Sequence, residues 1–374
     1  MKLATHSQRL ERWLGRDELA RISASMKDWY GPPIAVGRVP GEVFAHKGGD
    51  FRGRIEAGRE GSLVDYAVDR MYRLRRRVDR AAARRRRFVT LAAGFASLDD
   101  LIAEATAGKR QEIAYQKVGV TGVVGATNTL WFVGNQPAAG ANAGAAAGGT
   151  AWTRTSTGSL LFNNAGSGDT LHFVGGMPLA TVGGNTLLLY DRLHSTTKTM
   201  SSTGTESVTG VPSRYQATTA GAQDSAEGNF LAIECRTALS ATAHNWTTCL
   251  YTDQSGNGSA TLPSVTGNSS CIQYRLDQPV GQWFCPLASG DSGIKELDQM
   301  QCSASVTGAI DFTIGHPLAF MPCPVASVGF WTDGINSAFN LVRIFDDACL
   351  AFLEVLKSAT GATTYTGTVT LVSG

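Results

Sequence analysis

The tetrapeptide Gly290-Asp291-Ser292-Gly293 is the arrangement in this chain that most readily suggests catalysis. The same four residues surround the nucleophile in one class of serine protease, in which a histidine precedes the serine and acts as general base. Here only 48 residues separate His244 from Ser292, against roughly 140 in that class. Gly-Asp-Ser-Gly is also a favourable turn sequence. We therefore expect a turn here and no protease.

Other residues capable of chemistry are scattered. The six histidines and seven cysteines include no Cys-x-x-Cys pair and no metal-ligand spacing. The Gly-Gly pairs at 175–176 and 183–184 lack the Lys-Ser or Lys-Thr that completes a phosphate-binding loop. Asp346 and Asp347 suit a solvated helix position better than a catalytic carboxylate pair. We expect no enzyme, no catalytic residues, no cofactor and no metal.

The cysteines all lie between positions 235 and 349. One interpretation is that they are buried free thiols, which behave as small hydrophobic side chains. The other is that some form disulfides once the protein leaves the reducing interior of a cell. The sequence alone leaves both alternatives open.

A cluster of arginines is the most conspicuous charge feature. It comprises Arg70, Arg73, Arg76, Arg77, Arg80, Arg84, Arg85, Arg86 and Arg87. Clustered arginines favour contact with a DNA backbone or with an acidic neighbouring protein. The alternative is a solvated helix face, with Asp65, Asp69 and Asp79 at intrahelical distances. Few aromatic residues lie between the arginines, which argues against sequence-specific recognition of nucleic acid.

The elements that would carry these residues change character along the chain. Helical spacing of apolar residues predicts a basic helical arm over residues 1–88, with helices near 7–14, 17–30 and 63–87. Ser97 is a candidate N-cap for a short helix reaching Thr106. We therefore predict a helical connector over 89–117.

From residue 118 the pattern is that of β-structure. Short apolar runs bounded by Gly, Asn, Pro or Ser predict strands near 118–124, 129–133, 170–174, 186–190, 229–234, 245–251, 271–276, 311–314 and 364–372. Apolar residues within 335–356 have helical spacing and predict one helix there. The expected fold is mainly β with an α-helical N-terminal region. Residues 118–374 would form a β-sandwich or jelly-roll-like assembly domain, or two β subdomains.

Charge divides the chain at nearly the same place. Residues 1–117 carry 24 Lys and Arg against 15 Asp and Glu, whereas residues 118–374 carry 9 against 16. Charged residues make up 17% of the chain, and Gly alone contributes 43 residues. A low-charge, small-residue surface suits burial against neighbouring subunits. No stretch has the length and apolarity of a signal peptide core or a transmembrane helix, so we expect a protein made in a cytoplasm, with no membrane partner.

Five stretches of the β-rich part carry a resemblance to known proteins: residues 169–176 (DTLHFVGG), 187–192 (LLLYDR), 211–215 (VPSRY), 274–284 (YRLDQPVGQWF) and 345–354 (FDDACLAFLE). Together they resemble virion structural proteins of tailed bacteriophages. The resemblance runs from about residue 89 to the C-terminus. It implies membership of a virion and gives no catalytic residues. The arm lies outside the resemblance.

The resemblance and the composition lead to one expected function and one alternative. The expected function is assembly in many copies at the head, neck or tail junction of a phage, after synthesis in the host bacterial cytoplasm. Partners would be copies of itself, portal, capsid or tail proteins and packaged DNA backbone. The alternative is a capsid decoration or fibre protein that binds host-surface glycans, with Trp131, Trp152 and Trp331 lining a shallow sugar site.

Overall fold

The computed structural model describes residues 95, 97–144, 149–263, 265–334 and 341–374. The chain divides into two units, residues 1–92 and 93–374. The predicted helical arm and its nine arginines lie outside the described residues. No helix in the described part of the chain is long and apolar enough to cross a membrane.

In the described part of the predicted connector, residues 98–109 are helical and the following residues are not. Helix α4 (Leu98–Glu104) begins as expected at Ser97, whose Oγ accepts a hydrogen bond of 3.1 Å from the backbone N–H of Asp100. A short π-helical turn, η1 (Ala105–Lys109), follows and contains Gly108 at a φ of 90°. The next residues form strand β1 (Arg110–Val118), so the prediction of helix up to residue 117 is wrong. The side chains of β1 alternate between exposed and more buried positions, which is the period of a strand.

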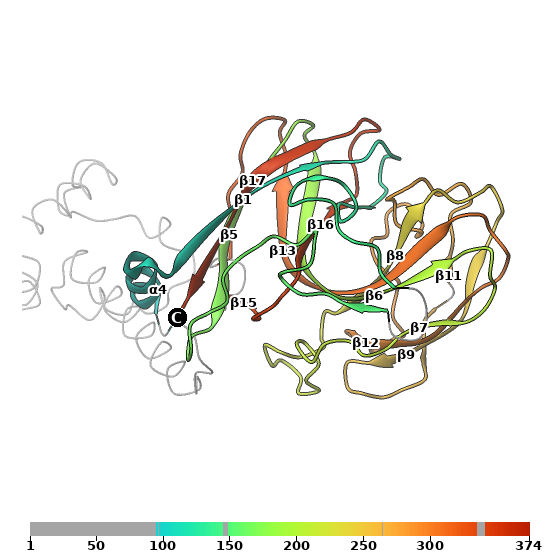
Figure 1. Ribbon diagram of the computed structural model, residues 1–374, viewed down its shortest axis with the longest axis horizontal. Helices are drawn as coiled ribbons and strands as arrows, with labels where there is room; N and C mark the ends of the chain where they lie inside the picture. Colours follow the sequence, from blue (N-terminus) through green and yellow to red (C-terminus); the bar gives the residue numbers. More distant parts are fainter. Residues whose placement is uncertain (1–94, 96, 145–148, 264, 335–340) are drawn as a thin grey trace, which may run out of the picture. The chain divides into compact units, whose positions relative to one another are not determined.

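The fold is mainly β, as predicted, and its strands form three antiparallel sheets (Figure 1). Sheet A contains, in spatial order, β14 (Thr332–Asp333), β5 (Leu171–Ala180), β17 (Thr364–Ser373), β1 and β3 (Asn135–Gln136), and β15 (Val342–Ile344) also pairs with β5. Sheet B contains β2 (Asn128–Thr129), β16 (Leu350–Val355), β6 (Asn185–Thr199), β13 (Ala309–Cys323) and β8 (Phe230–Thr237), and β4 (Thr150–Ala151) pairs with β6. Sheet C contains β10 (Ala260–Thr261), β9 (Asn245–Asp253), β12 (Ile294–Cys302) and β7 (Glu206–Val208), and β11 (Val265–Thr266) pairs with β9.

The two strands of 15 residues, β6 and β13, form a ribbon that runs the length of sheet B. Their register shifts between Ile314 and Gly315 and again between Pro317 and Ala319. Such bulges bend and twist a strand pair. Gly315 is required at the first bulge, because a Cβ there would lie 2.7 Å from the ring of Tyr190 and 2.9 Å from that of Phe230.

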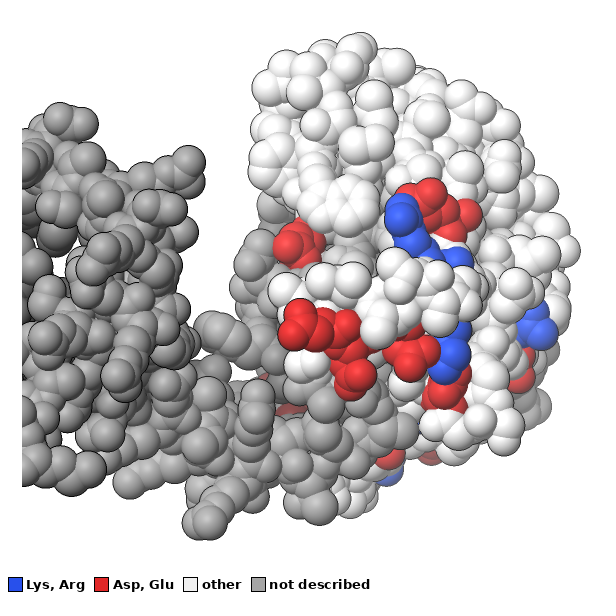
Figure 2. All heavy atoms as spheres, turned by 90° about the vertical axis from the view of Figure 1, so that its left-hand side faces the viewer, with Lys and Arg blue, Asp and Glu red and all other residues white. Residues whose placement is uncertain are grey.

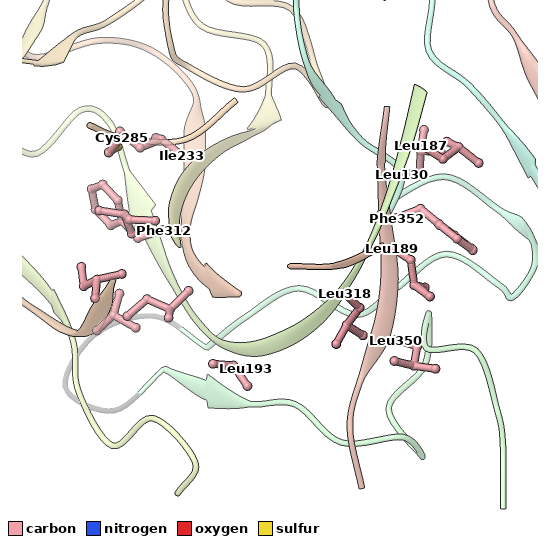
Figure 3. Packing of buried hydrophobic residues seen from close by; sticks show 14 of the residues in the cluster. Leu130, Leu187, Leu189, Leu193, Ile233, Cys285, Phe312, Leu318, Leu350 and Phe352 are labelled. Carbon is pink, nitrogen blue, oxygen red and sulfur yellow. The ribbon is translucent and has the colours of Figure 1, made fainter. Parts of the chain in front are cut away.

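Sheets A and C pack at opposite ends of this ribbon. At one end Tyr115 of β1 meets Phe352 of β16, with ring centroids 4.5 Å apart. At the other, Trp246 of β9 meets Phe312 of β13 at 5.1 Å. Figure 3 shows Phe312 on one side and Phe352 on the other, with Leu193 of β6 between them. One hydrophobic core therefore extends through all three sheets.

The predicted helix over 335–356 is absent from its described part. Residues 335–340 lie outside the described residues, and the rest contains strands β15 and β16. All six residues of β16 are buried, because β6 and β2 flank it and core lies on both faces. A strand buried on both faces has a continuous apolar sequence, which periodicity cannot distinguish from a buried helix.

Most of the predicted strands are confirmed, and three are wrong in large part. The stretches near 170–174, 186–190, 229–234, 245–251, 311–314 and 364–372 lie mostly within β5, β6, β8, β9, β13 and β17. Residues 119–124, 130–133 and 271–276 instead form turns and loops, with only single bridges at Arg275 and Leu276. Trp131 and Leu276 are buried in the hydrophobic cluster over the second face of sheet B, whereas Val123 and Val124 are 40% and 51% exposed.

The second face of the ribbon holds a buried ionic network. Arg192 of β6 reaches across β13 to Glu234 of β8, and two N–O distances of 2.7 and 2.8 Å join their side chains. Thr313 of β13, which lies between them, donates to Glu234 at 2.9 Å. The guanidinium carbon of Arg192 is 4.7 Å from the ring centroid of Trp131 and 5.6 Å from that of Trp152. A charge without water access is strongly destabilising unless a counter-charge accompanies it, and Glu234 supplies that counter-charge to Arg192.

Removing the negative partner of this pair should destabilise the fold strongly. Glu234→Gln leaves Arg192 buried without a counter-charge, and we expect the free energy of unfolding to fall by about 3–5 kcal/mol. Urea denaturation followed by circular dichroism measures the change. Glu112→Gln is the matched control, because its pair with Arg110 is about half exposed and should leave the urea midpoint nearly unchanged. Equal midpoints for the two variants would contradict the importance of the pair.

His316 gives a prediction of pH dependence. Its ring stacks on Tyr215 with centroids 3.8 Å apart, and burial lowers the pKa of His316 to about 4. A histidine in the unfolded chain titrates near 6.5. As the pH falls, the unfolded state takes up the proton first, so stability should decrease between pH 6.5 and 4 by up to about 3 kcal/mol. Unfolding curves across this range should show a weaker pH dependence in His316→Gln. An unchanged slope would contradict the assignment.

Candidate functional site

The structure separates the residues of the protease-like motif. His244 Nε2 lies 2.9 Å from Asp277 Oδ2, an arrangement that could orient an imidazole. Ser292, however, lies at the opposite end of β9, where its backbone N–H donates to Gln254 Oε1 at 3.0 Å. The nine residues of β9 span roughly 30 Å. Ser292 therefore cannot donate a proton to His244, and Gly290 has the positive φ, 101°, of a turn residue as predicted.

The buried pair of His244 and Asp277 has structural partners. His244 and the indole N–H of Trp246 both bind Asp277, which also accepts from the backbone N–H of Asn268 at 2.7 Å. Burial raises the pKa of Cys249 to about 11 and the pKa of Cys349 to about 12, so neither is a ready nucleophile at neutral pH. In the described ranges, no three His, Cys, Asp or Glu side chains are placed to hold a metal ion.

An open depression of about 590 Å³ lies between loops that join the sheets. Its walls are formed by residues 119–123, 133, 272–274 and 362. Most of these residues are small or apolar, and Tyr274 is the one titratable side chain among them. The depression therefore lacks the convergent charged groups of a catalytic site.

The three tryptophans proposed for a sugar site have different environments. Trp131 and Trp152 are only 1% and 3% exposed, and they pack on each other with ring centroids 4.9 Å apart. They hold Arg192 in the core, so their predicted place in a glycan site is wrong. Trp331 is 47% exposed. Nothing in the local sequence distinguishes these positions, because exposure depends on which strand each loop crosses.

Trp331 belongs to an exposed apolar strip along the edge of sheet A. We define the apolar strip as Met177, Val325, Val328, Phe330 and Trp331, each between 37% and 55% exposed. Backbone hydrogen bonds fix the segment that carries four of them: Ser327 N–H donates to the Ala180 carbonyl at 2.7 Å. Strand β14 then pairs with Gly175 and Gly176 of β5.

Glycines in β5 allow this segment to lie close to the sheet. A Cβ at Gly175 would overlap the indole ring of Trp331, so the ring can rest on the backbone only because that residue is glycine. Gly329 similarly faces Met177, whose sulfur would be 3.1 Å from an added Cβ. The apolar strip therefore lies on an ordered backbone that glycines allow to pack closely. The sequence analysis did not predict this surface.

Charged side chains are a minority of the chain, at 17%. Figure 2 shows one face of the molecule, on which uncharged residues predominate among those described. An exposed group of large apolar side chains is typical of a surface that contacts another protein or a ligand. The nine arginines predicted to contact an acidic partner or DNA lie outside the described residues.

Comparison with known proteins provides no family for this chain. No protein-family model matches it, and no curated protein matches it. One solved structure, titled "Structure of infectious bursal disease virus Gt strain", aligns with 71% of this chain and 81% of its own, at 9% identity and a TM-score of 0.14. A similarity that weak carries no argument about fold or function.

The exposure of the apolar strip can be tested directly on the isolated protein. Hydroxyl-radical footprinting with mass spectrometry should oxidise Phe330 and Trp331 much faster than Trp131, Trp152 and Trp246, because radicals reach only side chains in contact with water. Measurement at low protein concentration keeps copies apart. Protection of Trp331 under those conditions would show that another segment of the chain covers the strip.

Proposed function

We propose that this protein is a structural subunit of a tailed-phage virion, present in many copies at the head, neck or tail junction. The observation that carries the proposal is the apolar strip on a low-charge body of three antiparallel sheets. Monomeric proteins seldom leave several large apolar side chains exposed side by side. Repeated contact between subunits would bury them, in the way that closed-symmetry assemblies bury complementary patches.

The charge distribution supports a second contact in the same assembly. Residues 95–374 contain 12 Lys and Arg against 20 Asp and Glu, whereas residues 1–94 contain 21 against 11. The basic segment that carries the nine arginines would dock on an acidic face of a neighbouring subunit. Contact with packaged DNA backbone is the alternative, and it would show a steep loss of affinity with salt.

Binding of host-surface glycans is the second candidate function. The observation that favours it is the half-exposed indole of Trp331, which rests against the β5 backbone at Gly175. An exposed aromatic ring offers a planar apolar face to a sugar ring. The neighbouring Val328 and Phe330 favour a protein partner, since they extend the apolar surface well beyond one ring.

Polar replacement of the apolar strip should disrupt assembly. Phe330→Ser and Trp331→Ser each remove a large side chain of the kind that dominates interface energetics, so we expect a loss of about 2 kcal/mol, or roughly thirtyfold in association, for each. Native mass spectrometry across a concentration series measures the oligomer. Leu161→Ser is the matched control, because Leu161 is an isolated exposed leucine in another loop.

Three outcomes separate the candidates. A ring or other closed oligomer that is lost in the strip variants, and kept in Leu161→Ser, supports the assembly function. A stable monomer that binds glycans on an array through Trp331 supports the alternative. A stable monomer without such binding would contradict both.

A further inference from the structure

Two of the seven cysteines lie against each other. Cys235 is in β8, and Cys271 is in the segment 268–277, which crosses the edge of sheet B. The Cys235 sulfur is 3.4 Å from the carbonyl oxygen of Cys271, so the side chain of one cysteine contacts the backbone of the other. Both residues have an exposed fraction of 0%.

The backbone holds the two residues in this position from both sides. The N–H of Tyr274 donates to the Cys235 carbonyl at 2.6 Å, and the N–H of Cys235 donates to the Arg275 carbonyl at 2.8 Å. The N–H of Leu239 donates to the Cys271 carbonyl at 2.8 Å. These bonds hold residues 271–275 alongside β8, and the sulfur contact of 3.4 Å places Cys271 next to Cys235.

The other thiols have different neighbours. Cys285 accepts from the Gln278 side chain at 3.5 Å, and the Cys323 sulfur lies 3.9 Å from the carbonyl of Met321. The sulfur of Cys235, by contrast, contacts another cysteine, at the carbonyl of Cys271.

We propose that Cys235 and Cys271 form an intramolecular disulfide when the folded chain meets a small-molecule disulfide such as oxidised glutathione. One thiol loses its proton and attacks a sulfur of the oxidant, which releases one small thiol and leaves a mixed disulfide. The second cysteine then attacks the protein sulfur of that mixed disulfide and releases the second small thiol. The protein loses two electrons and two protons, and the oxidant gains both.

The cross-link would attach β8 to residues 268–277, a segment that makes several structural contacts. Residues 268–277 include Asp277, which binds His244 and Trp246, and they join sheet B through the bridge between Glu234 and Leu276. A disulfide closing the intervening loop reduces the entropy of the unfolded chain. Because the thiols are buried, formation requires the segment to open from β8, so it should be slow in the native state and fast near unfolding.

The first experiment uses the unmodified full-length protein. It is incubated with oxidised glutathione, its remaining thiols are alkylated without reduction, and peptides are mapped by mass spectrometry. We expect a peptide pair linked through Cys235 and Cys271, and a melting temperature raised by about 5 °C or more that dithiothreitol reverses. Mixed glutathione adducts without this linked pair, or links between other cysteines, would overturn the proposal.

Cysteine-to-serine variants test whether the disulfide causes the rise in melting temperature. Cys235→Ser and Cys271→Ser should each abolish the reversible rise in melting temperature, whereas Cys302→Ser should retain it. If a serine variant fails to fold, peptide mapping of the unmodified protein still decides the question. The result is independent of the oligomeric state, so failure of the disulfide and failure of the proposed assembly are read from different measurements.

Discussion

The continuous ribbon of β6 and β13 is the constraint on which the other parts of the structure depend. Sheet A packs against the ribbon close to β16, and sheet C packs against it close to β8. Side chains of the ribbon contribute to the hydrophobic core beneath both sheets. One face of the ribbon is apolar, and the other, equally buried, combines apolar side chains with charged and hydroxyl groups. The ion pair of Arg192 and Glu234 spans β13 on that second face and requires β6, β13 and β8 to lie in one register.

Burial on both faces also explains which structural features could be predicted from sequence. Strands with clear turn signals, such as β9 and β17, and the N-cap at Ser97 follow from local residue preferences. The sequence of β16 resembles that of a buried helix, because neither face of the strand is solvated and its apolar residues are continuous. Arg192 gives no sequence signal of its burial, since its counter-charge at Glu234 is 42 residues away.

The candidate surfaces were less predictable than the strands. Trp131, Trp152 and Trp331 occupy similar loop-like sequences, yet only the last is exposed, because its segment lies along an edge of sheet A and the others lie over sheet B. The closeness of Cys235 and Cys271 depends on a crossing that involves no regular strand. Such features arise from tertiary packing, which short-range patterns do not encode.

The order of strands in space has a consequence for synthesis of the chain. In sheet B, β13 lies between β6 and β8, and in sheet A, β17 lies between β5 and β1, so each middle strand is made after both of its neighbours. Neither sheet can close until its late strand arrives, and until then β6 and β8 present unpaired edges. Folding is therefore governed by long-range pairing and should be slow, with the emerging chain dependent on protection from aggregation on the ribosome.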